Sequence, residues 1–267
     1  MPLPSPIKFK KVWKVKTNQD ISEFEDLLAT ETKVRLLINE QEILSLAATP
    51  MHLKELIVSF ILTEGLIQDV WCPEELELIE KNGEVIAKVY TYEKVDLPSK
   101  TLSSGCFASY SFLSEIQPYN SFNFKVDKNS IFNLFKAFVR KAELFKLTGC
   151  LHSAAICSQE DIIFYAEDIG RHNAVDKVLG YALLNGLSFE DKLILVSGRI
   201  SSEMVLKVGR WKIPFLISRS APTSLAVELA EKIGVTLIGF LRGERFNVYT
   251  YPQRILEFAN HGGSNGN

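Results

Sequence analysis

The feature that most restricts the fold is a regular alternation of strand-like and helix-like segments in the second half of the chain. Two strand-like runs, Ala154–Cys157 and Ile162–Ala166, come first. The segments that follow alternate in type: a helix at His172–Leu184, a strand at Leu193–Val196, a helix at Ser202–Val208, a strand at Phe215–Ile217, a helix at Ser224–Ile233 and a strand at Val235–Phe240. Strands separated by helices are typical of βαβ crossovers, so we predict an α/β domain with a mostly parallel sheet covered on both faces.

The first third of the chain is predicted to be a smaller α+β region. Apolar runs at Val34–Ile38 and Glu42–Ala47 are separated by three polar residues. Two further runs, Leu76–Ile79 and Val85–Tyr90, flank an Asn-Gly pair. Each pair of runs favours a hairpin. Between the hairpins, Leu53–Leu66 has apolar residues at helical spacing.

A long connection separates these two parts. Asp96–Asn123 is rich in Ser, Gly, Pro, Asn and Tyr and shows no clear periodicity, and structureless segments of this length are usually functional or disordered. A helix over Ser130–Leu147 is expected next. We therefore predict an N-terminal region over 1–98, a mobile loop carrying Cys106 over 99–125, the α/β domain over 126–258 and a disordered tail over 259–267.

Composition excludes several classes of partner. The net charge is -2, so no global basic field is available to hold nucleic acid or an anionic membrane, and any anion site must be local. The longest strongly apolar run, Leu56–Leu62, is too short to span a bilayer. The basic N-terminus lacks the pattern of a secretion signal and the four cysteines are too scattered for a disulfide framework, so we expect a cytoplasmic protein.

Four loops at one edge of the predicted sheet are candidates for an anion site. They leave the carboxyl ends of strands, and they are 167–173, 197–201, 218–223 and 241–245. The first three each open a helix, whose free N–H groups attract anions, and arginine binds phosphate or carboxylate oxygens in a bidentate way. The alternative is that small residues here make turns and the arginines are surface charges. Four loops together favour a shared anionic ligand.

Histidine and cysteine residues near this edge have either a structural role or a role in a ligand or metal site. His172 either packs against a nearby carboxylate or points into the ligand edge beside Asp168 and Asn173. Cys150 and His152 share a face if their segment is a strand, but a zinc site needs three or four convergent ligands. We therefore expect Cys150 and Cys157 to be small core residues.

Cys106 lies in the polar sequence Leu-Ser-Ser-Gly-Cys, where burial does not explain it. An exposed thiol becomes a nucleophile when positive charge or N–H groups lower its pKa, although an incidental surface cysteine would have the same sequence environment.

Long runs from Thr148 to Ile255 resemble the FdhD family, the sulfurtransferases that serve as formate dehydrogenase accessory proteins. The runs are GCLHSAA, EDIGRHNAVDKVLGYAL, LVSGRISSEM, SRSAPTSLAVELAEKIG and GFLRGERFNVYTYPQRI. The resemblance implies a cytidine deaminase-like three-layer domain without deaminase activity. The residues agree with that exclusion, since Ala154 stands where a zinc deaminase needs glutamate and no Pro-Cys-x-x-Cys follows.

The resemblance also implies a function and a site. Family members take persulfide sulfur from a cysteine desulfurase and deliver it to the molybdenum bis(molybdopterin guanine dinucleotide) cofactor for formate dehydrogenase. Cys106 matches the persulfide cysteine, and homodimers are expected. The predicted cofactor-binding residues are Phe240, Leu241, Arg242, Gly243, Glu244, Arg245, Arg171, His172, Gly198, Arg199 and Ser220.

One departure and two alternatives accompany this expectation. Some relatives carry a second cysteine two residues after the first, whereas Ala108 stands there in this chain. Cys106 would therefore act alone, or sulfur transfer is impaired and cofactor binding is the function that remains. A non-catalytic chaperone that carries the cofactor is the main alternative, and a hydrolase or deaminase is a third, disfavoured by the missing metal ligands.

Overall fold

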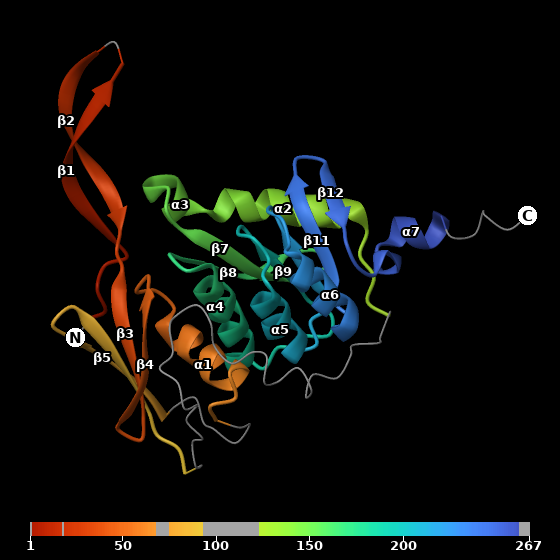
Figure 1. Ribbon diagram of the computed structural model, residues 1–267, viewed down its shortest axis with the longest axis horizontal. Helices are drawn as coiled ribbons and strands as arrows, with labels where there is room; N and C mark the ends of the chain where they lie inside the picture. Colours follow the sequence, from red (N-terminus) through yellow and green to blue (C-terminus); the bar gives the residue numbers. More distant parts are fainter. Residues whose placement is uncertain (1, 18, 68–74, 93–122, 262–267) are drawn as a thin grey trace, which may run out of the picture.

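The computed structural model describes residues 2–17, 19–67, 75–92 and 123–261 and shows a mixed α/β fold (Figure 1). Its largest sheet has six strands in the order β12-β11-β10-β9-β7-β8. The strands are β7 (His152–Cys157), β8 (Ile162–Asp168), β9 (Leu193–Val196), β10 (Phe215–Ser218), β11 (Thr236–Arg242) and β12 (Arg245–Val248). All five strands predicted for this part of the chain are present, and β12 is an additional strand that was not predicted.

The prediction of a mostly parallel sheet is wrong for the strand pairs. Only β9–β10 and β10–β11 pair in parallel, whereas β7–β8, β7–β9 and β11–β12 are antiparallel. The reason is the length of the connections: a turn at 158–161 joins β7 to β8 and Gly243-Glu244 joins β11 to β12, which is too short for a crossover. Two successive reversals nevertheless leave β8 pointing the same way as β9, β10 and β11.

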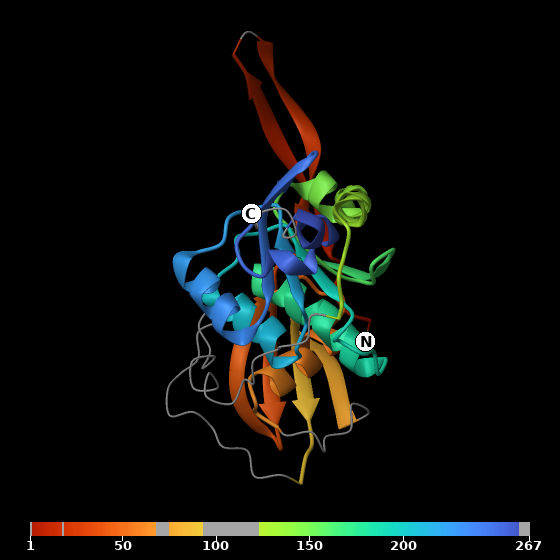
Figure 2. The same cartoon turned by 90° about the vertical axis from the view of Figure 1, so that its right-hand side faces the viewer.

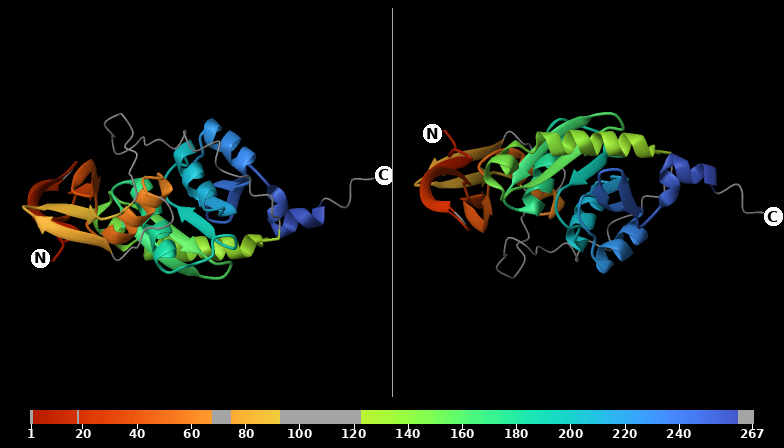
Figure 3. Two further views of the ribbon diagram at one scale, coloured as in Figure 1. Left: turned by 90° about the horizontal axis from the view of Figure 1, so that it is seen from below. Right: turned by 90° about the horizontal axis from the view of Figure 1, so that it is seen from above.

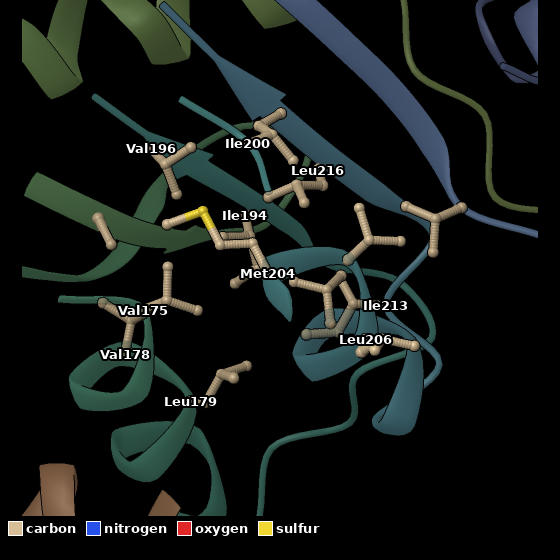
Figure 4. Close-up of a cluster of buried hydrophobic side chains, with 14 of the residues drawn as sticks. Val175, Val178, Leu179, Ile194, Val196, Ile200, Met204, Leu206, Ile213 and Leu216 are labelled. Carbon is tan, nitrogen blue, oxygen red and sulfur yellow. The ribbon is translucent and has the colours of Figure 1, made fainter. Parts of the chain in front are cut away.

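Helices cover both faces of this sheet, which gives three layers (Figure 3). One face packs on α2 (Lys128–Lys141), and the other on α4 (Arg171–Leu184), α5 (Ser202–Arg210) and α6 (Ser224–Ile233). Figure 4 shows the hydrophobic core between the sheet and α4, α5 and α6, where Met204 lies among branched side chains of the sheet and of α4. The three layers agree with the prediction, while the likeness to cytidine deaminases stays a prediction.

The N-terminal part forms a four-stranded sheet with one helix. The strands are β3 (Thr32–Ile38), β4 (Gln41–Ala48), β5 (Leu76–Lys81) and β6 (Glu84–Val89), in the order β4-β3-β6-β5. Both predicted hairpins are confirmed. Helix α1 (Leu53–Thr63) buries one apolar face on this sheet and packs its other side on α4, so it lies between the two cores.

A long two-stranded arm, β1 (Ile7–Lys16) with β2 (Gln19–Ala29), was not predicted from the sequence. It projects away from the rest of the molecule (Figures 1 and 2). Lysines interrupt the apolar positions of β1 and acidic residues those of β2, so neither strand has the clean alternation of a half-buried strand.

Helix boundaries differ from the sequence prediction at two places. The helix predicted over 130–147 is two helices, α2 and α3 (Glu143–Thr148), because Ala142 leaves the helical region. Residues 259–261 of the predicted disordered tail belong to α7 (Leu256–His261). The predicted boundary at 98–99 falls outside the described residues. None of the helices in the described part combines the length and apolar character needed to cross a bilayer.

Candidate functional site

The predicted ligand edge exists because β8, β9, β10 and β11 end on the same side of the sheet. The loops after β8, β9 and β10 open α4, α5 and α6, as predicted. Free N–H groups at these helix starts and the cationic side chains of the loops therefore face one edge.

The loops after β9 and β10 are bonded into one unit. Ser218 Oγ donates to the Gly198 carbonyl at 2.6 Å, and the Ile200 N–H donates to the Ala221 carbonyl at 3.1 Å. The Thr223 N–H returns a bond to the Ile200 carbonyl at 3.0 Å. These bonds fix the two loops relative to each other, so residues carried by either loop keep a constant separation.

The end of β11 joins this unit through a β-bulge at Phe240. The register shifts between Gly239 and Arg242, and Phe240 has φ 53°, a left-handed conformation that is unusual for a bulky residue. Its N–H donates to the Ser220 carbonyl at 3.0 Å, and its ring is 37% exposed. Bulges and strained residues cluster at functional sites, where they aim side chains.

Arginines from different loops lie at this edge of the sheet. Arg242 Nε donates to the Arg219 carbonyl at 3.3 Å, and its guanidinium lies 6.0 Å from the centre of the Phe240 ring. Arg171 packs against Gly198, where a Cβ atom would stand 3.4 Å from Arg171 Cβ. Arg171 Nε is buried and has no hydrogen-bond partner among the described residues. A buried N–H without a partner is costly, which fits a site that an anionic ligand completes.

Two histidines lie beside Arg171, and both are neutral at pH 7. Burial, with the nearby Arg171 charge, lowers the pKa of His172 to about 4. The same two causes lower the pKa of His152. His172 Nε2 lies 3.1 Å from Glu203 Oε2 and 3.2 Å from Ser201 Oγ, so its ring is held by the start of α5. His172 therefore packs against a carboxylate, that of Glu203, as one of the two predicted alternatives has it.

A cavity of about 450 Å³ opens at this edge, which we call the Cys150 cavity. Its polar wall carries Cys150, His152, Ser197 and Arg219, while Lys146 and apolar side chains of α2 and α3 form the opposite wall. Cys150 is exposed, so the prediction that it is a core residue is wrong: the chain leaves α3 through Gly149 and reaches β7 only at His152. Cys157 is buried, as predicted.

A second cavity of about 520 Å³, the Arg245 cavity, lies between α2 and β12. Glu244 and Arg245 line it from the hairpin, and Asn129, Asn133 and Lys136 line it from one face of α2. The α2 residues were not predicted from the sequence, although their polar side chains recur at helical spacing beside Phe132. That spacing was the available signal.

The matched family model, FdhD/NarQ, covers residues 29–256. The chain belongs to this family. The sulfur carrier protein FdhD of Bacillus subtilis (strain 168) is 36% identical over 255 residues, which are 93% of this chain and 97% of the relative. The protein of the same name from Listeria innocua is 36% identical over 242 residues, 87% of this chain and 93% of the relative. The crystal structure of a protein described as a formate dehydrogenase accessory protein from Desulfotalea psychrophila matches with a TM-score of 0.75 and 29% identity, covering 95% of this chain and 100% of that one.

Other predicted residues have different environments. Cys106 and Ala108 lie outside the described residues. The Leu241 side chain is fully buried against the α2 face of the sheet, so only its backbone can face a ligand, and its predicted role stays a prediction. Arg199 is exposed beside the bonded loops, and Gly243 makes the β11–β12 turn at φ 56°.

Asp168 is wholly buried and already has four partners, so it has a structural role and cannot relay protons to a ligand. It pairs with Lys177 Nζ at 2.6 Å and accepts from the Thr49 N–H at 3.0 Å, which ties α4 to the N-terminal part. Gly170 and Asn173 donate to its other oxygen.

A metal site at Cys150 and His152 would need at least one further ligand. The described residues contain no group of three or more His, Cys, Asp or Glu placed to hold a metal.

Proposed function

We propose that this protein is a sulfurtransferase that carries sulfane sulfur on Cys106 and delivers it to a molybdenum bis(molybdopterin guanine dinucleotide) bound as substrate at the sheet edge. Similar proteins are named sulfur carrier proteins, and one is described as a formate dehydrogenase accessory protein. The observation that carries the proposal is that Arg171, Arg219 and Arg242 lie on loops at one edge of the sheet, with Arg171 Nε buried and unpaired among the described residues.

The residues present suit such a substrate. Arginine forks bind phosphate oxygens in pairs, so the arginine cluster would hold the phosphates. The exposed Phe240 ring offers a stacking surface for a guanine base. The Arg245 cavity adds two lysines, two asparagines and an arginine within reach of the same hairpin. The bonded loops hold these groups in place before the ligand arrives, which reduces the cost of binding.

The sulfur chemistry needs no external oxidant beyond the donor. A cysteine desulfurase would present a persulfide, the Cys106 thiolate would attack its terminal sulfur, and the desulfurase thiolate would leave. Transfer of the terminal sulfur to the substrate would break the S–S bond of the Cys106 persulfide and leave the Cys106 thiolate, with the two electrons that bring sulfane sulfur to the sulfide level coming from the reduced metal of the substrate. Formate dehydrogenase would receive the sulfurated cofactor, and we expect these exchanges to occur in the cytoplasm.

Persulfide formation on Cys106 is the first test. After incubation with a cysteine desulfurase and cysteine, we expect the Cys106 peptide to gain one sulfur, about 32 Da, that a reductant removes. The Cys157 peptide is the internal control, because burial raises the pKa of that thiol to about 12 and keeps it unreactive. A Cys106→Ser protein that still matures formate dehydrogenase fully would exclude Cys106 as the sulfur-carrying residue.

The arginine cluster predicts a specific loss of ligand affinity. We expect Arg219→Ala and Arg242→Ala each to weaken binding of guanosine diphosphate roughly tenfold, the worth of one charge-assisted hydrogen bond. Arg35→Ala is the matched control, since Arg35 pairs with Glu42 in the N-terminal sheet. Titration calorimetry gives the affinities, and equal affinity in all variants would place the ligand elsewhere.

We further propose that two copies of the chain associate through the β1–β2 arm. Four apolar side chains on one face of the arm are strongly exposed: Phe9 69%, Trp13 68%, Val15 71% and Ile21 64%. An isolated two-stranded ribbon is marginal in water, and exposed apolar patches mark interaction sites. The same face carries Lys11 beside Glu25, so a two-fold axis can set the lysine of one copy against the carboxylate of the other.

We expect the wild-type protein to sediment as a dimer and Phe9→Ser/Trp13→Ser to sediment as a monomer with unchanged circular dichroism. Lys10→Ser, on the opposite face of the same strand, should leave the dimer intact. A monomeric wild-type protein at micromolar concentration would exclude this interface.

A further inference from the structure

We infer that Cys150 is a second persulfide-forming thiol and that His152 is the base that deprotonates it, so that sulfane sulfur is received in the Cys150 cavity. The inference rests on the proposed function and extends it. Ala108 removes the possibility of a two-thiol relay within the Cys106 loop. The structure assigns the second thiol to a different segment of the chain.

The wall of the Cys150 cavity combines a thiol with polar and cationic groups. A thiol, a histidine, a serine and an arginine from three separate segments face one space of about 450 Å³, and Lys146 faces it from α3. Cations near a thiol favour the thiolate, which is the form that attacks sulfur. Phe138, Val139 and Phe145 form the opposite wall, and such apolar surface limits the water that would hydrolyse or disperse a persulfide.

His152 is close to Cys150 along the chain and is neutral at pH 7. It lies two residues after Cys150, and both side chains line the cavity. Gly198 approaches the ring closely, since a Cβ atom there would stand 3.3 Å from His152 Nδ1. Arg171, Asp168 and the neutral His172 lie around the ring, and Arg219 and Lys146 line the same cavity. Burial with the Arg171 charge lowers the pKa of His152, so its ring is neutral at pH 7.

Cys157, five residues beyond His152, has the opposite environment to Cys150. Cys157 is fully buried in the core against α2, and burial raises the pKa of its thiol to about 12. Packing therefore explains Cys157 but does not explain Cys150, which is exposed in a cavity. The two thiols provide a reactive and an inert site in one protein.

The reaction is a thiol–persulfide exchange in which atoms and electrons balance. His152 takes the proton of Cys150, and the thiolate attacks the terminal sulfur of a donor persulfide, which is an R–S–SH compound. A new S–S bond forms on Cys150, the donor S–S bond breaks, and the donor leaves as a thiolate that accepts the proton from His152. The sulfane sulfur moves without net oxidation or reduction, so no co-reactant is required.

The test follows sulfur on individual cysteine peptides. Wild type, Cys106→Ser, Cys150→Ala and His152→Asn are incubated with a cysteine desulfurase and cysteine at pH 7, and peptide masses are taken with time. We expect sulfur on Cys150 in the wild type. In His152→Asn we expect it to appear about 100-fold more slowly, the usual worth of a general base. At pH 10, where cysteine thiols ionise without help, the two proteins should react at similar rates.

The outcomes separate this inference from the proposed function. Sulfur on Cys106 but never on Cys150 would overturn the inference and leave the proposed function standing. Sulfur on neither residue would overturn both. Sulfur on Cys150 in Cys106→Ser would support the second thiol and overturn Cys106 as the entry point. Equal rates for wild type and His152→Asn at both pH values would remove His152 from the reaction, and thermal unfolding of each variant checks that the fold is intact.

Discussion

Replacing Lys207 with methionine is expected to lower the free energy of unfolding by about 3–5 kcal/mol at pH 8, because the change removes the partner of two buried carboxylates. Lys207 Nζ lies 2.8 Å from Glu64 Oε1 and 3.1 Å from Asp176 Oδ1, and all three side chains are almost fully buried. They join α1, α4 and α5, so the N-terminal part and the α/β core share this cluster. Methionine keeps the length of the side chain, which isolates the effect of charge.

The loss in Lys207→Met should be smaller at pH 5. Burial raises the pKa of Asp176 to about 6, and Lys207 opposes that rise, so removing Lys207 raises the pKa further. A raised carboxyl pKa contributes stability that is complete below the unfolded value, about 3.9, and is lost as the pH rises through the folded value. At pH 5 the Asp176 carboxyl of the variant is neutral, and little unpaired charge remains there.

Urea unfolding at pH 5 and pH 8 measures both effects. Lys232→Met, at an exposed position of α6, is the control and should change stability by less than about 0.5 kcal/mol. Asp176→Asn should flatten the pH dependence of the wild-type protein between about pH 4 and pH 6. Equal losses for Lys207→Met at both pH values would mean that Asp176 does not titrate in this range.

The ligand edge could be predicted from sequence because it depends on local features. Each loop follows an apolar run and opens a helix, and the direction of consecutive crossover strands brings the loops to one edge. Hydrogen bonds such as that from Ser218 to Gly198 then add detail without changing the location. The sequence therefore places the loops of Arg171, Arg219 and Arg242 at one edge, and the structure agrees with that placement, while the binding roles predicted for these and the hairpin residues stay predictions.

The features that sequence did not predict depend on distant partners. Asp168 is a loop carboxylate by sequence, yet it is satisfied by Thr49, which is 119 residues away. The Lys207–Glu64 pair spans 143 residues. Cys150 follows a helix and precedes an apolar strand, so its sequence environment resembles that of Cys157, and only the cavity distinguishes them. A single sequence shows periodicity but not which side chains meet across two cores.

Gly180→Ala is expected to destabilise the protein by about 3 kcal/mol, at the upper end of what one added core methyl group costs. A Cβ atom at Gly180 would stand 1.8 Å from the Glu55 carbonyl oxygen and 2.5 Å from its carbonyl carbon. Both are backbone atoms of α1, so no side chain can rotate away and the two helices must separate. The intrinsic helix preference of alanine over glycine, about 1 kcal/mol, acts in the opposite direction and is too small to compensate.

This separation would also reach the ligand edge. Thr49, just before α1, donates to Asp168, and Asp168 holds the start of α4 that carries Arg171 and His172. We therefore expect Gly180→Ala to weaken binding of guanosine diphosphate as well as stability, while Asn185→Ala at the exposed end of the same helix should change both much less. Urea unfolding and calorimetric titration on the same samples distinguish the cases. Unchanged stability in Gly180→Ala would show that α1 does not press on α4, and lost stability with full affinity would show that the edge is held by the sheet alone.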